Sequence, residues 1–200
     1  MQSISRKNPW ITVADLLSSV VLILLLLYVL AVIIPQFTQE NRQRNMMLKI
    51  DSQLKEYEER GQIKVHLETG TLEFTSLTFD SGSAELTPAT KSMIGDLSKL
   101  LIEYMASEPM MEILVEGHTD PAVVQSVRNK GGYFADNVQL STLRAANVRA
   151  ALLGYLGAEY AGRIGVAGYG ETRLKNKENP LSPENRRIEI RILWHGTDDK

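Results

Sequence analysis

One acidic side chain at the start of a long apolar run is the most chemically suggestive feature of the sequence. Asp15 directly precedes Leu16–Ile34, which contains no charged residue, and Ser18 and Ser19 follow one helical turn later. Residues at i, i+3 and i+4 share a helix face, so these polar groups form a short stripe. A low-dielectric site favours a neutral carboxylate, so Asp15 facing a partner helix or a water-filled pathway could load and release a cation. The alternative is an interfacial carboxylate at the positive end of the helix dipole.

A His-Thr-Asp triplet at residues 118–120 invites a catalytic or metal-binding interpretation. The chain has three histidines (His66, His118 and His195), and no spacing of histidines and carboxylates resembles a zinc site. The sequence also lacks cysteine, a G-x-S-x-G element and a phosphate-binding P-loop. We therefore expect neither an enzyme nor a protein that holds a metal or another cofactor.

The charge of the chain argues against nucleic acid as a partner. The formal net charge is -2 at pH 7, whereas phosphate binding needs a basic surface. The absence of cysteine also removes disulfides and thiolate nucleophiles from consideration.

The apolar run predicts one membrane-spanning helix. Its roughly 19 residues would extend about 29 Å as a helix, which matches the hydrocarbon core of a bilayer. Pro9 can open this helix, Trp10 suits the interface, and Pro35 can close it. The run is too long for the core of an ordinary signal peptide, and no Ala-x-Ala site follows it.

Residues 36–61 form a polar stretch with balanced charges and a short apolar seam. Met47, Ile50, Leu54 and Tyr57 are spaced by three, four and three residues, as in about two heptads of a coiled coil. One interpretation is a parallel two-stranded neck that makes the protein a dimer. The other is an amphipathic helix that lies on its own domain or on the membrane surface.

The rest of the chain predicts an α+β domain. Alternating or continuous apolar patterns predict strands at Ile63–Leu67, Leu72–Phe79, Met111–Glu116, Arg163–Gly168 and Arg187–Trp194. Thr87 can cap a helix that Pro88 opens and that runs to about Ser107, and a second helix is expected from about Ser141 to Leu156. Because strands and helices interleave, we expect a two-layer sandwich with the helices on one face of a mixed sheet.

Five blocks in this region occur in an order that resembles a known family. They are FDSGSAEL (Phe79–Leu86), EGHTD (Glu116–Asp120), NVQLSTLRA (Asn137–Ala145), GYGE (Gly168–Glu171) and NRRIEIRI (Asn185–Ile192). Together they resemble the OmpA-like peptidoglycan-binding domain found in OmpA, Pal and the flagellar motor protein MotB, over roughly residues 62–194.

The resemblance implies a binding site for the diaminopimelate of the peptidoglycan stem peptide. Such a zwitterion needs a fixed carboxylate and a fixed guanidinium: Asp120 would pair with the ammonium, and Arg144 would hold a carboxylate by a bidentate fork. The remaining matched positions are Thr119, Asn137, Leu140 and Arg186. The alternative for Asp120 and Arg144 is a structural ion pair at a helix end.

Two segments depart from the family pattern, and one is the stretch before Asn185, which is shorter than in members with an extra Gly-Arg element. Between Asp120 and Asn137 the stretch 121–136 is longer than the usual loop and contains two adjacent glycines followed by Tyr133 and Phe134. This loop could cover the pocket, block it, or form a dimer contact.

The combination of an acidic span and a wall-binding domain is similar to stator subunits of the MotB type. It implies a single-pass protein of the bacterial inner membrane, with a cytoplasmic stub (1–9), a transmembrane helix (10–35), a helical neck (36–61) and a periplasmic domain (62–200). The implied partners are peptidoglycan, H⁺ or Na⁺, and a polytopic MotA/ZorA-like protein, with five copies around a dimer of this chain. The Pro-Trp and Asp-Leu pairs at residues 9–16 resemble most closely the ZorB subunits of Zorya anti-phage systems. The alternatives are a flagellar MotB-type stator and a passive OmpA/Pal-like tether between membrane and wall.

Overall fold

The structure, a computed structural model, describes residues 9–75, 79, 83–122 and 136–194. The chain divides into two compact units, Met1–Asn45 and Met46–Lys200. Each unit is described by itself below.

The first unit is built from one long helical segment. Helix α1 (Pro9–Tyr28) leads through a π-helical turn, η1 (Val29–Ile33), into the beginning of α2 (Ile34–Glu59). The apolar side chains of α1 are exposed along its length. Among the described residues this is the one helix that is long and apolar enough to cross a membrane.

The helix does not end at Pro35, contrary to the sequence prediction. In the turn before this proline the N–H of Ile34 bonds to the carbonyl of Val29, which is an i→i−5 contact. Proline has no N–H to donate, and a π-turn is one of the local adjustments by which an apolar helix continues past it. The helix therefore runs on into the segment that was expected to be a separate neck.

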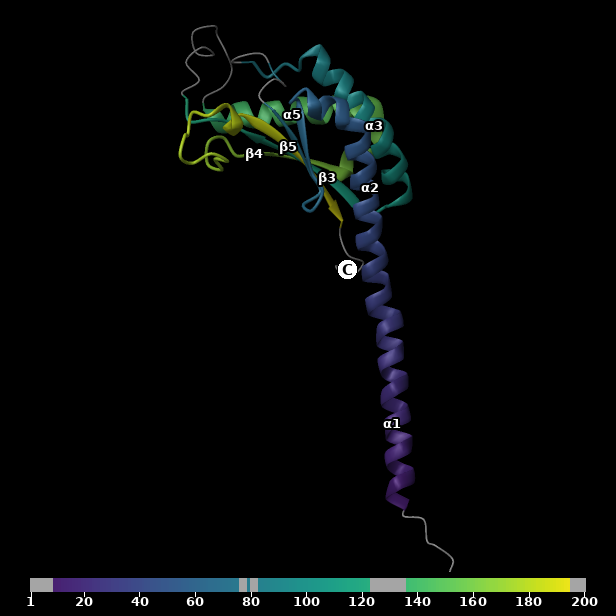
Figure 1. The fold of residues 1–200 in the computed structure, drawn as a ribbon. Coiled ribbons are helices and arrows are strands. Elements are labelled where there is room, and N and C mark those ends of the chain that lie inside the picture. Colours follow the sequence, from purple (N-terminus) through teal and green to yellow (C-terminus); the bar gives the residue numbers. More distant parts are fainter. Residues whose placement is uncertain (1–8, 76–78, 80–82, 123–135, 195–200) are drawn as a thin grey trace, which may run out of the picture. The chain divides into compact units, whose positions relative to one another are not determined.

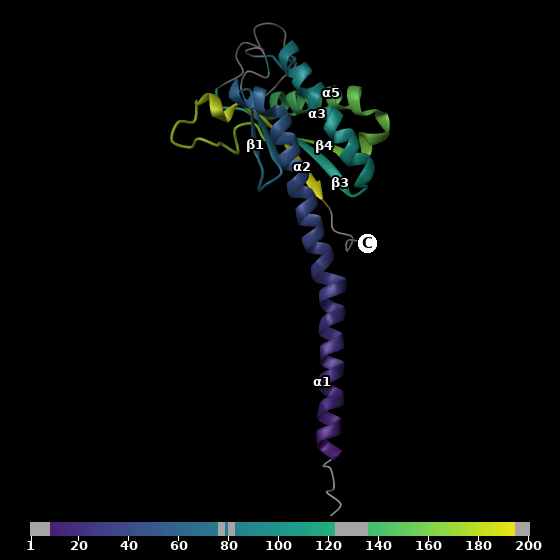
Figure 2. The ribbon, with the colours of Figure 1, turned by 45° about the vertical axis from the view of Figure 1, so that its right-hand side comes forward.

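The second unit confirms the predicted α+β sandwich. Its sheet has the order β1-β2-β5-β3-β4, with one parallel pair, β3 and β4, and antiparallel neighbours elsewhere. The strands are β1 (Ile63–His66), β2 (Thr71–Phe74), β3 (Met111–His118), β4 (Ile164–Gly168) and β5 (Arg187–Trp194). The helices α3 (Pro88–Ser107) and α5 (Asn137–Leu156) cover the same side of this sheet (Figures 1 and 2), and the short 3₁₀ turns are η3 (Ala158–Arg163) and η4 (Pro183–Asn185).

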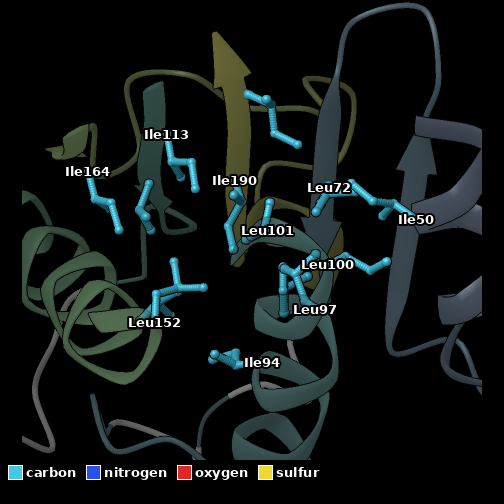
Figure 3. Packing of buried hydrophobic residues seen from close by; sticks show 14 of the residues in the cluster. Ile50, Leu72, Ile94, Leu97, Leu100, Leu101, Ile113, Leu152, Ile164 and Ile190 are labelled. Carbon is cyan, nitrogen blue, oxygen red and sulfur yellow. The ribbon is translucent and has the colours of Figure 1, made fainter. Parts of the chain in front are cut away.

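The core lies between the sheet and these helices. Ile188, Ile190 and Ile192 alternate along β5 with charged residues, and all three are buried, as the pleat of a strand requires. Figure 3 shows Ile190 close to Leu101 of α3, with Leu152 of α5 in the same cluster. The other face of the sheet carries charged side chains together with Leu114 and Leu193.

The second half of α2 belongs to this core. Met46, Met47, Ile50 and Leu54 are each at most 1 % exposed, and Ile50 joins the cluster beside β2 (Figure 3). The hydroxyl of Tyr57 donates a hydrogen bond of 2.7 Å to Asp96 Oδ2 on α3. The apolar seam is therefore packed on its own domain, which is the second of the two interpretations. The compact unit accordingly starts at Met46 and not at residue 62.

The ends of several elements differ from the sequence prediction. Helix α5 begins at Asn137 instead of Ser141, because the carboxylate of Asp136 accepts a bond of 2.8 Å from the N–H of Gln139 and caps the helix. Strand β2 ends at Phe74, and Phe79 forms only an isolated bridge with Leu86. The predicted cap of α3 is confirmed, since Thr87 Oγ1 accepts from the N–H of Thr90 at 3.2 Å.

Candidate functional site

Three distant segments of the chain meet at one end of the sheet. The EGHTD block forms the end of β3 and continues into Thr119 and Asp120. Strand β5 runs antiparallel to β3 with His118 opposite Arg187, so Arg186 lies beside the residues that follow β3. The first turns of α5 complete the site from the helical layer, because this helix packs against β3 and β4.

Asp120 is the buried anion of the site. It is 6 % exposed, and its Oδ2 accepts a bond of 2.6 Å from Arg186 Nη1. Its Oδ1 accepts from the N–H of Ala122 at 3.2 Å, and its carbonyl accepts from Asn137 Nδ2 at 3.3 Å. Both carboxylate oxygens are therefore held, and the predicted residues Asn137 and Arg186 are both in contact with Asp120.

Arg144 is the buried cation of the site. It is 8 % exposed, its Nε donates to the carbonyl of Ser83 at 2.9 Å, and its guanidinium lies 5.0 Å from the centre of the Phe79 ring. Burial, and then the positive charge of Arg186, lower the pKa of Arg144 to about 10, against the opposing effect of Asp120. Among the described residues neither Nη atom has a hydrogen-bond partner, so the open end of the guanidinium can receive a ligand carboxylate.

The two remaining predicted residues line the same region. Thr119 is buried, and its N–H donates to the carbonyl of Gly170 at 2.9 Å. Its hydroxyl has no partner among the described residues. Leu140 is buried on α5, one turn before Arg144. The long loop that was expected to influence access falls mostly on residues 123–135, outside the described residues.

Two glycines let α5 approach the sheet closely beneath the site. A Cβ atom on Gly117 would lie 2.1 Å from the carbonyl oxygen of Ser141, and one on Gly168 would lie 2.0 Å from Thr142 Oγ1. The hydroxyl of Ser141 also accepts a bond of 2.9 Å from the N–H of Gly170. The EGHTD and GYGE blocks thus position the helix that carries Arg144.

A second polar cluster lies on the face of the sheet away from the helices. The side chains of Glu116, His118 and Glu189 each bring a potential metal-ligand atom within 4.8 Å of the others. His118 is buried, and neither ring nitrogen has a hydrogen-bond partner among the described residues, although Nε2 lies 4.0 Å from Glu189 Oε1. Sequence reasoning missed this cluster because Glu189 comes from a distant strand. The usable signal was the period-two spacing of Glu116 and His118, which puts both on one face.

The carboxylates of this second cluster are already paired. Glu189 accepts a bond of 2.6 Å from Arg187 Nε, and Glu116 accepts one of 3.4 Å from Arg191 Nη1. Burial, reinforced by the charge of Arg187, lowers the pKa of His118 to about 4, so its imidazole is neutral at pH 7. Since both carboxylates already have a guanidinium partner, we assign the cluster a structural role.

In the first unit the three polar residues of the predicted stripe all lie in α1. Ser18 Oγ donates to the carbonyl of Ala14 at 2.8 Å, and Ser19 Oγ donates to the carbonyl of Asp15 at 2.9 Å. Both hydroxyls are thus bonded within their own helix. Asp15 is the ionisable group of the stripe.

The fold and the site together define an OmpA-like domain, with a buried carboxylate and guanidinium at the end of β3. The OmpA family matches residues 78–187, which is more than half of the chain, and the chain belongs to this family. No functionally curated protein matches the chain.

Solved structures share this fold. A MotB-like protein of Desulfovibrio vulgaris has 25% identity and a TM-score of 0.60, over 80% of this chain and 99% of that one. The cell wall anchor of the T6SS from Pseudomonas aeruginosa has 20% identity and a TM-score of 0.58, over 73% and 97% of the two chains. The periplasmic domain of Helicobacter pylori MotB has 20% identity and a TM-score of 0.52, over 64% and 78%.

Proposed function

We propose that the domain binds the stem peptide of peptidoglycan and anchors an ion-driven complex of the inner membrane to the cell wall. The observation that carries the binding proposal is that a buried carboxylate, Asp120, and a buried guanidinium, Arg144, belong to one site, and that within the described part of the chain the Nη atoms of Arg144 have no hydrogen-bond partner. A diaminopimelate residue offers an ammonium and a carboxylate to these two groups. Charge-assisted hydrogen bonds of this kind are about twice as strong as neutral ones, and the fork of an arginine adds geometric selectivity.

The test of the binding proposal is sedimentation with purified peptidoglycan sacculi. The full-length protein in mild detergent should co-sediment with sacculi, and Asp120→Ala and Arg144→Ala should each remove most of that binding. Arg60→Met removes an exposed ion pair between Arg60, just after α2, and Glu56 on that helix. This variant is the control and should bind like the wild type. Retention of binding in both site variants would refute this site.

We extend the proposal to the membrane segment. A single apolar helix that carries Asp15 precedes a domain similar to a MotB-like protein, which supports a stator subunit with a cytoplasmic N-terminus and a periplasmic domain. In this arrangement the binding of H⁺ or Na⁺ neutralises Asp15 and weakens its contacts with a ring of MotA/ZorA-like partners. Release of the ion restores these contacts. The residues around Asp15 resemble ZorB, so the proposed output is defence against phage.

The assembly itself can be measured directly. The C-terminally tagged, full-length protein would be purified from its native membranes in mild detergent, and the mass of the intact complex determined. Two copies of this chain inside several copies of a polytopic protein are expected. A protein that emerges alone, or only with wall fragments, would refute the stator.

A passive tether is the second candidate, and one observation favours it. The chain has the fold of a protein described as the cell wall anchor of the T6SS, which shows that this fold also occurs in an anchor. A tether has no use for a carboxylate in its span, so the behaviour of Asp15 variants separates the two functions.

A further inference from the structure

We propose that Arg186 competes with the ligand for the carboxylate of Asp120. The guanidinium of Arg186 is bonded to the carboxylate that the ligand's ammonium must reach. Ligand binding therefore exchanges one cation for the other. The inference rests on the proposed stem-peptide site and deepens it. It also reverses the role expected for Arg186, which the sequence analysis grouped with the residues that hold the ligand.

The first step is that each carboxylate oxygen of Asp120 already accepts a hydrogen bond, one of them from a cation. Arg186 Nη1 donates to Oδ2 at 2.6 Å, and the N–H of Ala122 donates to Oδ1 at 3.2 Å. A carboxylate can accept further bonds, but an ammonium placed beside this guanidinium would meet a like charge in a poorly solvated site. An ammonium therefore binds Asp120 well only when Arg186 has left.

The second step is that Arg186 is free to leave while Asp120 is not. The side chain of Arg186 is 39% exposed, against 9% for that of Asp120. Among the described residues the bond to Asp120 is the only one that its guanidinium makes. Its backbone is fixed separately, because its N–H donates to the carbonyl of Pro183 at 3.1 Å and Asn185 Nδ2 bonds the carbonyls of the preceding loop. A rotation of the side chain alone would open the carboxylate.

The third step is the charge of the site before and after the exchange. With Arg186 in place, the described residues supply two guanidinium groups and one carboxylate, and the charge of Arg186 contributes to the lowered pKa of Arg144. A ligand carboxylate can bind Arg144 whether or not Arg186 is bonded to Asp120. A ligand ammonium gains its partner only by removing Arg186 into water, where the guanidinium is well solvated.

The exchange gives a signature that a direct contact would not give. If Arg186 competes, its removal strengthens the binding of a ligand that carries both ammonium and carboxylate groups. It does not strengthen the binding of a ligand that carries only carboxylates. If Arg186 instead holds the ligand, its removal weakens both.

The experiment compares meso-diaminopimelate with pimelate, the same dicarboxylate without its amino groups, by calorimetric titration of the full-length protein in detergent. Arg186→Met should bind diaminopimelate about two- to fivefold more tightly than the wild type, which is the range for loss of a partly exposed charge pair. Pimelate should bind Arg186→Met no more tightly than the wild type. Arg186→Gln is the second variant if the methionine variant does not fold, and the same result is expected.

Arg191→Met is the matched control. Arg191 lies on β5, which Arg186 immediately precedes, and its side chain is 41% exposed. It pairs at 3.4 Å with the buried carboxylate of Glu116, outside the site. This variant should bind both ligands like the wild type. Weaker binding of diaminopimelate by Arg186→Met than by the wild type would overturn the inference and leave the proposed function standing. Absence of diaminopimelate binding and of sacculus binding in all variants, the wild type included, would overturn both.

Discussion

At the scale of single residues, the proposed binding of a ligand carboxylate depends on the burial of Arg144. Arg144 is held by a bond from its Nε to the carbonyl of Ser83 and by the face of Phe79, so its guanidinium is fixed before a ligand binds. A guanidinium that is fixed in this way loses little conformational entropy when it binds a carboxylate. The pair on the exposed side of the site, between Asp120 and Arg186, is more readily exchanged.

Arg144→Lys should therefore weaken sacculus binding by about tenfold or more, although the charge is kept. A lysine ammonium cannot present two parallel donors to a carboxylate, and it cannot also retain the bond to Ser83. Sedimentation with sacculi at several protein concentrations measures the change. An Arg144→Lys variant that binds as the wild type does would show that the bidentate contact is not used.

His118 should make the domain less stable as the pH falls. In the folded state its pKa is lowered to about 4, first by burial and then by the charge of Arg187, whereas the unfolded side chain titrates near 6.5. Between these values the unfolded chain binds the extra proton, so the free energy of unfolding decreases as the pH falls from about 6.5 towards 4. Urea unfolding of Met46–Lys200 at pH 7, 6 and 5 should show this decrease.

The His118→Phe variant is the test of the assignment. Both ring nitrogens lack partners among the described residues, so phenylalanine gives up no hydrogen bond there and keeps the contact with the ring of Tyr169. Its stability should vary less between pH 7 and pH 5 than that of the wild type. Burial raises the pKa of Glu73, but the hydrogen bonds and charges of Lys175, His66 and Lys64 together lower it below its usual value. The resulting contribution to stability is lost only below about pH 4.5. An unchanged slope in the phenylalanine variant would exclude His118 as the cause.

At the scale of elements, the distance between α5 and the sheet is set by residues without side chains. Gly117→Ala should destabilise the domain by about 3 kcal/mol or more, because its Cβ would fall 2.1 Å from the backbone oxygen of Ser141 and neither backbone can yield cheaply. Thermal and urea unfolding measure the loss. Gly154→Ala, on α5 where an added Cβ would meet no packing atom within 4 Å, is the matched control and should stabilise by up to about 1 kcal/mol. Equal effects of the two substitutions would refute the packing argument.

The second half of α2 is also an element of the domain. A fragment that begins at residue 46 should fold, whereas one that begins at residue 62 should be largely unfolded. The shorter fragment loses Met46, Met47, Ile50 and Leu54, and burial of each such side chain contributes about 1.5–3 kcal/mol, a sum comparable with the whole stability of a small domain. Circular dichroism with urea unfolding distinguishes the two fragments. A cooperative transition of equal midpoint in both would show that α2 is dispensable.

At the scale of the whole molecule, the proposed motor depends on one ionisable group in the apolar helix. Asp15→Asn should abolish function while leaving the mass of the intact complex unchanged, because the amide keeps the size and polarity of the carboxylate but cannot exchange a cation. Protection of cells against phage and the mass of the purified complex are the two measurements. Thr38→Val, beyond the apolar run with a hydroxyl bonded to the carbonyl of Ile34, is the control and should remain active. Full protection by Asp15→Asn would refute the ion relay.

The sequence by itself determined the features that depend on near neighbours. The apolar run, the Thr87-Pro88 helix start and the alternation along Arg187–Trp194 are local patterns, and each appears in the structure where it was expected. The order of the five blocks along the chain was also sufficient to predict the OmpA family. Helix ends that depend on a single cap, such as Asp136 before α5, were placed less accurately.

Only the tertiary structure decided which surfaces and charges face each other. The seam from Met47 to Tyr57 has the same period whether it packs on a second copy or on its own domain, because a helical pattern shows that one face is buried but not against what. The pairing of Asp120 with Arg186 joins residues that are far apart in the chain through the register of β3 and β5. The cluster of Glu116, His118 and Glu189 arises in the same way. Such contacts depend on strand order and register, which the spacing of residues along one chain does not contain.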